Sequence, residues 1–596
     1  MAQITRTGSP GEVSDILPRS STNTYQYSPF SKDAEKSSIR LIRLLPGYPS
    51  SPVVVELVTV PLDPGKIPYY EAVSYVWGTS YQQYEIACDG LSMAVSESAL
   101  LALRRFRFVD HIRLLWIDQI CINQQDDKEK SSQVMLMGEI YGTASQVLVY
   151  LGEADDTSDK AMDYISERRA QQEEWPRQFV VQVLSRPWFS RVWILQEVAL
   201  AHTSLVICGA KCVPWPCFPE WWTRNELLLG PEVNPPPVLS YGLSVMKRFT
   251  LLQQLHDTRH SKATLALDKI YALLALLQPE DRIGVLVDYS LSTAEVYTSV
   301  AKSIIERTKS LAILSGKEEK PYVERERLPS WVPDWGTVPS TVSLGLANKY
   351  LDPFDAGGKP ACRVNISIPL NGPPTLHCLG ITFDTVKKLS LSTMRPGQDA
   401  ATNNVEVLVD WLDLISGSSS SVVSETADYL IGQFNQNLRG VSSYSRSPPQ
   451  PPKFAYSLWT TIQALSTPTL QLEPAELHAR NNRGEPTSST LKFCYERKLF
   501  LTHSGALGLG PPDLLQGDTV AVLLGAPVPH ILRRLPSSEQ NNSANVYALV
   551  GECFVDGIMA GEALNHLQDQ LKEMGHRCRT FAKSCSNAPL ETFCIQ

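Results

Sequence analysis

The chain has 596 residues, of which 43% are hydrophobic and 19% are charged, and its formal net charge is −8 with a pI near 5.8. This length excludes a single hydrophobic core and indicates two or three globular domains, while the acidic balance excludes broad nucleic-acid binding, which requires a basic face. No stretch approaches ~18 uninterrupted apolar residues, and the opening residues lack the apolar centre of a signal peptide. We therefore expect a soluble, cytoplasmic protein with no membrane span.

The first predicted domain occupies residues 37–215 and follows an arm, residues 1–36, whose Ser, Thr and charge content predicts disorder. Short apolar runs in this domain alternate with helix-favouring segments. That alternation predicts an α/β domain with a parallel sheet and crossover helices. The runs are Ile39–Leu45, Val53–Leu57, Tyr70–Gly78, Arg113–Ile120 and Gln146–Gly152.

Two helices are predicted from apolar periodicity in this domain. Residues 126–144 carry a stripe that includes Val134 and Ile140, with acidic residues at the amino-terminal end. Residues 188–202 carry a second stripe, beside which Trp193 and Glu197 are four positions apart and share a face.

The rest of the chain divides into two predicted regions. Residues 216–340 have mixed or helical patterns and are expected to form a helical extension packed on the first domain. Residues 341–596 are expected to form an α+β region whose last part is mostly β, with disordered loops near 416–421 and 442–453.

The 12 cysteines are scattered, and in a reducing compartment most are small buried apolar residues. The tightest group, Cys208, Cys212 and Cys217, has neither a CxxC pair nor a nearby histidine. We therefore predict no metal site.

Four blocks in the first domain together resemble the fungal heterokaryon incompatibility (HET) domain. They are Tyr70–Gly78, Leu115–Gln124, Gln133–Gly152 and Arg186–Glu197, and the resemblance covers roughly residues 69–210. Asp268–Leu273, Trp331–Trp335 and the Gly-rich C-terminal region are similar to the usual companions of that domain. The resemblance implies a filamentous-fungal protein of non-self recognition, a form of innate immunity in which the HET domain induces programmed cell death.

HET domains are distantly similar to TIR domains, which are flavodoxin-like α/β units that either assemble as adaptors or cleave NAD. TIR enzymes place the catalytic glutamate four residues after a tryptophan on a helix, and Trp193 and Glu197 have that spacing. The resemblance thus implies a flavodoxin/TIR-like fold, Glu197 as catalytic carboxylate, and NAD as substrate with no further cofactor. A carboxylate can stabilise the positive charge that develops on ribose as nicotinamide leaves.

Four more residues are candidates for substrate binding because they lie at or after predicted strand ends, where open α/β sheets bind ligands. They are Ser74, Trp77, Asp118 and Asn123. Trp193, which shares a face with Glu197, is a further candidate for substrate binding. The alternative is structural: Asp and Asn also turn and cap loops, and Trp77 can pack in the core. Glu197 likewise has an alternative as an ordinary partner of Arg186 or Arg191.

A thiol hydrolase is less well supported by the sequence than NAD cleavage, and a non-enzymatic function is a further alternative. Cys121 with His111 or His202 has the residue types of a thiol hydrolase but no recognisable local signature. The remaining alternative to an NAD-cleaving enzyme is a non-enzymatic module that self-associates and signals cell death. In either case an incompatibility or sensor protein is expected to act in trans.

Overall fold

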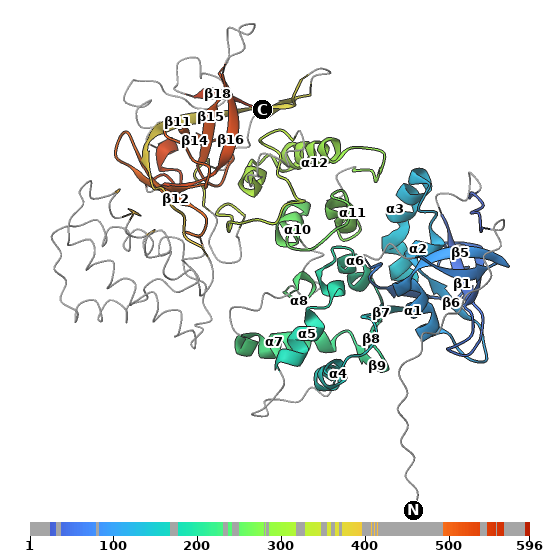
Figure 1. Ribbon diagram of the computed structural model, residues 1–596. Coiled ribbons are helices and arrows are strands. Elements are labelled where there is room, and N and C mark those ends of the chain that lie inside the picture. The colour runs from blue at the N-terminus through green and yellow to red at the C-terminus, as the bar shows by residue number, and fades with distance from the viewer. Residues whose placement is uncertain are drawn as a thin grey trace, which may run out of the picture. The chain divides into compact units, whose positions relative to one another are not determined.

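The computed structural model describes much of the chain as two compact units (Figure 1). One unit comprises Met1–Phe189 and Gln196–Asn234, and the other comprises Ser190–Leu195 and Pro235–Gln596. The predicted division at 215 therefore differs from the observed one, and the helical and C-terminal regions group together. The residues described are 24–30, 37–78, 83–166, 177–229, 236–240, 249–278, 281, 285–317, 328–346, 354–358, 364–368, 372–395, 407, 410–411, 414, 493–536, 545–555, 557–565 and 590–596.

The first unit is built on a nine-stranded sheet of order β5-β4-β2-β1-β6-β3-β7-β8-β9. Its centre, β6-β3-β7-β8, is parallel, whereas the flanking pairs β1–β2, β1–β6, β4–β5 and β8–β9 are antiparallel. The strands are β1 (Ser38–Leu44), β2 (Val54–Pro61), β3 (Glu71–Ser74), β4 (Gln83–Cys88), β5 (Leu91–Ser96), β6 (Arg113–Trp116), β7 (Gln146–Tyr150), β8 (Ser204–Cys208) and β9 (Lys211–Pro214).

The prediction of a parallel sheet was therefore right for its centre and for the β2–β4 pair, and the sheet as a whole is mixed. Parallel neighbours require a long crossover, whereas antiparallel neighbours need only a tight turn. Asp89-Gly90 supplies such a turn between β4 and β5, and both residues have positive φ, 50° and 78°. Gly209, also with positive φ, lies between β8 and β9.

Helices connect and flank the strands of this unit, with α1 and α3 beside the sheet in Figure 1. Ser96 caps α1 by accepting from the Ala99 N–H, and Asp126 caps α3. The predicted stripe of α3 is buried as expected, including Val134 and Ile140. The helices are α1 (Glu97–Phe106), α2 (Asp118–Cys121), α3 (Asp127–Thr143), α4 (Ser158–Ser166), α5 (Arg177–Leu184), the 3-10 helix η1 (Pro187–Ser190), α6 (Ile194–Ala199) and α7 (Cys217–Leu229).

Part of the arm predicted to be disordered is ordered in the structure. Residues 24–30 lie against the first unit, where Thr24 forms a parallel bridge with Ser92 on the edge strand β5 and the Tyr25 N–H donates to the Ser92 carbonyl (2.8 Å). Aromatic residues concentrated in 24–30 provide this packing, which the polar average composition of residues 1–36 concealed.

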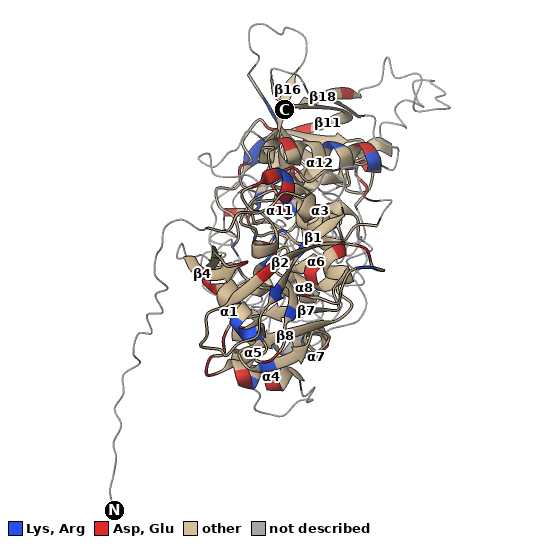
Figure 2. Ribbon diagram, turned by 90° about the vertical axis from the view of Figure 1, so that its right-hand side faces the viewer, with Lys and Arg blue, Asp and Glu red and all other residues tan. Residues whose placement is uncertain are grey.

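The second unit combines helices with a closed set of strands. The helical elements are α8 (Pro237–Ser240), α10 (Leu251–Asp257), α11 (Asp268–Leu274), α12 (Thr293–Thr308) and η3 (Ala312–Gly316). The ribbon of α12 carries both acidic and basic positions in Figure 2, and Lys302 Nζ lies 4.0 Å from Glu306 Oε1. Within the described residues, no helix has both the length and the hydropathy needed to cross a membrane.

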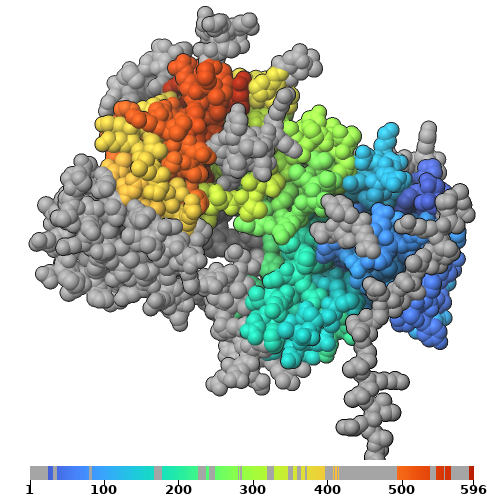
Figure 3. Space-filling model, in the orientation of Figure 1, coloured from blue at the N-terminus to red at the C-terminus, as the bar shows by residue number. Residues whose placement is uncertain are grey.

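Five strands of the second unit close into a ring, because β11 pairs with β14 at one end and with β18 at the other end of the run β14-β15-β16-β18. In Figure 3 the yellow and orange segments of this unit form one body. The two predicted loops, 416–421 and 442–453, lie outside the described residues. The strands are β10 (Val364–Ser367), β11 (Thr375–Leu389), β12 (Lys498–Thr502), β13 (Leu507–Gly510), β14 (Thr519–Leu523), β15 (His530–Arg534), β16 (Val546–Glu552), β17 (Phe554–Val555) and β18 (Glu591–Ile595).

Candidate functional site

The candidate site lies at the carboxyl end of β3, the strand from which the parallel part of the sheet extends in both directions. β3 is paired with β6 on one side and with β7 on the other. The chain forms β3, then adds β6 on one side and β7 on the opposite side, so the order reverses at β3. Ligands of open α/β sheets bind beyond the carboxyl ends of strands at such a reversal. Ser74 is the last residue of β3.

Three buried side chains form a hydrogen-bonded chain at this strand end. The Trp188 indole N–H donates to Ser74 Oγ (2.7 Å), and Ser74 Oγ donates in turn to Glu197 Oε2. Ser74 and Glu197 are 1% exposed and Trp188 is fully buried. Because the indole can only donate and the hydroxyl has a single hydrogen, the direction of the chain is fixed toward the carboxylate. We refer to it as the Trp188–Ser74–Glu197 chain.

Local structure differs here from the predicted single helix over 188–202. The segment forms two short helices, η1 and α6, separated at Arg191 and Val192, where Arg191 forms a bridge with Lys262. The extended backbone at the bridge lets the Val192 N–H donate outside the helix, to the Lys262 carbonyl (2.9 Å). Trp193 therefore precedes α6 by one residue and is half-buried, while Glu197 lies on α6 itself.

Trp188 was not among the predicted site residues. It lies in the Arg186–Glu197 block, and its ring packs edge-on against Phe189 and Trp215, with centroids 5.0 and 5.8 Å away. Arg186, proposed above as an alternative partner of Glu197, instead donates to Asp155 Oδ2 (2.6 Å) and to the carbonyls of Leu151 and Glu153.

A second contact joins the loop after β3 to the first residue of α2, the short helix that follows β6. The Trp77 indole N–H lies 3.0 and 2.9 Å from the two carboxylate oxygens of Asp118. Trp77 is 36% exposed, so the alternative of core packing is wrong for this tryptophan. Asp118 also accepts from the Gln119 N–H (2.7 Å). The structure thus brings these two predicted binding residues together with an indole ring partly open to solvent.

Asn123 makes the contacts of a turn residue. Its side-chain Oδ1 accepts from the Gln125 N–H (3.2 Å), and its backbone N–H donates to Glu129 Oε1 (2.7 Å). These bonds shape the entry to α3, which is the alternative role considered for Asn123.

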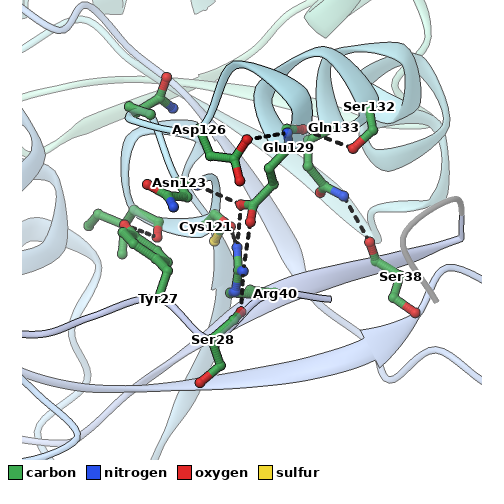
Figure 4. A network of polar contacts seen from close by, with 12 residues as sticks. Tyr27, Ser28, Ser38, Arg40, Cys121, Asn123, Asp126, Glu129, Ser132 and Gln133 are labelled. Atoms are coloured by element: carbon green, nitrogen blue, oxygen red, sulfur yellow. Dashed lines mark hydrogen bonds and ion pairs between the residues drawn. The ribbon is translucent and has the colours of Figure 1, made fainter. Parts of the chain in front are cut away.

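A buried ion pair holds the segment Asp118–Asn123, which contains α2, in place (Figure 4). Arg40 on β1 donates to both carboxylate oxygens of Glu129 (2.6 and 3.0 Å) and to the carbonyls of Cys121 (3.1 Å) and Ser28 (2.8 Å). The guanidinium also lies over the rings of Phe30 and Tyr27, 4.2 and 5.0 Å from their centroids. The Tyr27 hydroxyl donates to the Ile120 carbonyl (2.9 Å). The ordered part of the arm therefore supports the same segment that carries Asp118.

Cys121 is a packing residue in this segment. It is fully buried, and burial raises the pKa of its thiol to about 12, so the thiol stays protonated at neutral pH. Its sulfur accepts from the Ile117 N–H (3.4 Å). His111 is exposed and its Nδ1 lies 2.7 Å from Asp110. These contacts do not support a thiol hydrolase built on Cys121.

Two protein families match this chain, one in each unit. The family described as heterokaryon incompatibility protein (HET) matches residues 70–197, a span that contains Ser74, Trp188 and Glu197. The Het-6 beta-barrel domain family matches residues 469–570, which include β12 to β17 but neither β11 nor β18. No solved structure matches the chain.

Two fungal relatives are similar to this chain. Heterokaryon incompatibility protein 6, OR allele, from Neurospora crassa is 27% identical over 91% of this chain and 97% of its own length. Vegetative incompatibility protein HET-E-1 from Podospora anserina is 31% identical over 25% of this chain and 10% of its own length. The chain therefore belongs to the fungal proteins that carry a HET domain.

Proposed function

We propose that this protein is a HET-domain effector of fungal non-self recognition and programmed cell death, and that its first unit hydrolyses NAD. Both relatives carry names of incompatibility proteins, which supports the role in non-self recognition. The protein acts in the cytoplasm and is activated by self-association or by an incompatibility or sensor protein supplied in trans.

The order of the parallel strands supports a TIR-like unit. Numbered among themselves along the chain, the four strands β6-β3-β7-β8 have the order 2-1-3-4. The flavodoxin-like order begins in the same way, and its ligand binds at the reversal between the first and third strands. The corresponding position here is the end of β3, where Ser74 lies.

The observation that carries the proposed chemistry is the contact between Ser74 and Glu197 at that strand end. In the reaction, the bond between ribose C1′ and the nicotinamide nitrogen breaks, and nicotinamide leaves with the bonding electrons. The Glu197 carboxylate stabilises the cation that forms at C1′. Water then adds to C1′ and loses a proton, which yields ADP-ribose. Ser74 orients the carboxylate, and the partly exposed ring of Trp77 offers a face on which a base can stack.

The burial of Glu197 favours a second candidate function. With 1% of its surface exposed, Glu197 does not reach a substrate in this conformation, so catalysis requires a rearrangement that uncovers it. If no such rearrangement occurs, the Trp188–Ser74–Glu197 chain serves only to stabilise the fold. The HET domain is then a non-enzymatic module that assembles with partners to signal cell death.

Nicotinamide release from NAD by the purified full-length chain, at low and high protein concentration, separates these functions. Glu197→Gln is the test variant because it removes the charge and keeps the shape of the side chain. Glu139→Gln, at an exposed position of α3, is the matched control. Release that is lost only in Glu197→Gln supports the enzyme. Absence of release from folded, self-associated wild-type protein supports the assembly module.

A further inference from the structure

A short connector joins the two ends of the Trp188–Ser74–Glu197 chain. Residues Ser190–Leu195 group with the second unit, whereas the residues on both sides of them group with the first. Trp188 lies two residues before this connector and Glu197 two residues after it, and both contact Ser74. The connector therefore links the donor and the acceptor of the same serine hydroxyl.

The connector is fixed by main-chain hydrogen bonds to a turn of the second unit, residues 258–262. The Val192 N–H donates to the Lys262 carbonyl (2.9 Å), and the Lys262 N–H donates to the Ser190 carbonyl (2.5 Å). Val192 is fully buried, whereas Lys262 is exposed. Lys262 thus contributes its backbone to this contact, and its side chain faces solvent.

A buried lysine shapes the turn. Lys269 on α11 is 6% exposed, and its ammonium donates to the carbonyls of Arg259 (2.8 Å) and Ser261. Burial lowers the pKa of Lys269 to about 8, which reflects the cost of removing an ammonium from water. Within the turn, the Ser261 N–H donates to the Thr258 carbonyl (2.8 Å). The ammonium therefore holds two carbonyls of the turn that pairs with the connector.

A second buried cation, the guanidinium of Arg259, joins the turn to two other segments. Arg259 is 2% exposed and donates to the carbonyls of Gly316 (2.5 Å) and Asp334 (2.7 Å). Lys269 lies in the segment Asp268–Leu273 and Asp334 in the segment Trp331–Trp335, the two companion segments identified in the sequence. Both segments thus converge on the turn that holds the connector.

We infer that Lys269 is a positioning residue for Glu197, acting through the turn 258–262 and the connector Ser190–Leu195. The second unit thereby determines whether the two hydrogen bonds of the Trp188–Ser74–Glu197 chain stay formed. The structural part of this inference stands without the proposed NAD hydrolysis, and only its kinetic consequence rests on that function.

Hydrogen–deuterium exchange of the full-length protein tests the structural part. Lys262→Pro removes the N–H that bonds Ser190, whereas Lys262→Ala keeps both main-chain bonds and serves as the control. We expect amide exchange in residues 186–200 to accelerate on the order of three- to tenfold in Lys262→Pro, as the loss of one hydrogen bond predicts, and to be unchanged in Lys262→Ala. Faster exchange confined to residues 250–275 would overturn the inference.

Lys269→Met tests the lysine itself, with the same exchange readout in residues 186–200. Wild-type exchange there, in a folded variant, contradicts the inference. If the variant does not fold, the two Lys262 variants decide. Where the wild type releases nicotinamide, Lys262→Pro should lower kcat about tenfold with KM for NAD within about twofold, because a displaced carboxylate weakens the transition state more than binding. Absence of release in the wild type rejects the proposed function and leaves the exchange test intact.

Discussion

Each of the two units contains a buried Arg–Glu pair, and the comparison shows how similar pairs serve different ends. Arg40 and Glu129 in the first unit are 3% and 6% exposed, and Arg497 and Glu552 in the second are 2% and 5% exposed, both with closest contacts of 2.6 Å. The first pair holds the segment that carries Asp118 and the ordered part of the arm. The second holds residues 342–345 against the strands, since Glu552 accepts from the N–H groups of Leu344 and Gly345.

The difference lies in what each arginine touches besides its glutamate. Arg40 contacts two aromatic rings and two carbonyls from separate segments near the candidate site. Arg497 donates to the carbonyls of Val342 and Glu552. A buried pair is costly to desolvate and is retained where it fixes a conformation. We therefore expect the Arg497 pair to matter for stability alone, and the Arg40 pair to matter for stability and for the site.

The largest expected effect is the loss of either arginine. Arg40→Met and Arg497→Met each leave a buried carboxylate without its cation, which should cost about 3–5 kcal/mol of unfolding free energy in the affected unit. Denaturant titration with pulse proteolysis, in which fragments report each unit, measures this. Only Arg40→Met should also change the solvent exposure of Trp77. A cost below about 1 kcal/mol in both variants would mean that neither pair fixes its unit.

The next largest effect is expected from acid, which should lower the stability of the second unit. His530 in β15 is fully buried, and burial lowers its pKa from 6.5 to about 4, although the Val528 backbone partly opposes this. Between these values the unfolded chain binds the proton and the folded chain does not. Stability of the second unit is therefore complete above pH 6.5 and falls by about 3 kcal/mol as the pH drops to 4. His530→Leu should remove this contribution and leave that of His256, whose pKa burial also lowers to about 4 in the same unit. A slope unchanged by His530→Leu would assign it to other groups.

Ser74→Ala should have a smaller effect, confined to the first unit. It leaves the Trp188 N–H and the Glu197 carboxylate without their shared partner, which predicts a loss of about 1–3 kcal/mol. Ser74→Thr, which keeps the hydroxyl, is the control. Equal stability of Ser74→Ala and wild type in denaturant would show that the Trp188–Ser74–Glu197 chain does not stabilise the first unit.

The smallest effect is expected in the arm. Tyr27→Phe removes the hydroxyl that bonds the Ile120 carbonyl but keeps the ring beside Arg40, and should cost about 0.5–1.5 kcal/mol. Tyr25→Phe, which removes a neighbouring hydroxyl, is the control, and exchange of amides 117–123 is the measurement. Exchange that increases equally in both variants would indicate that the hydroxyl of Tyr27 does not support the segment.

The sequence predicted the strands of the first unit better than their pairing. Apolar runs identified β1, β2, β3, β6 and β7. In β1, β3 and β7 nearly every residue is buried, which leaves a continuous hydrophobic signature, whereas β2 is partly exposed. The β4–β5 hairpin was missed although Asp89-Gly90 is a strong turn signal. Arg40 within an apolar strand was also a readable signal, since a buried arginine demands a partner.

Tertiary contacts account for most of what was not predicted. Glu197 and Ser74 were chosen separately, but their contact and the role of Trp188 depend on three segments that only the fold brings together. The break between η1 and α6 is set by Lys262, which is remote in sequence. β18 pairs with β11, which is remote in sequence, and this pairing has no local signal.

The closure of the ring by β18 has a consequence for biosynthesis. Leu376 in β11 pairs with Ile595 in β18, so most of the C-terminal region must be synthesised before the ring can close. Every strand of the first unit precedes residue 215 and can pair earlier, as domains generally do during synthesis. Until β18 arrives, β11 and β16 expose unpaired edges that can recruit other chains. Between these two events the unpaired strand edges make the nascent chain most susceptible to misassembly.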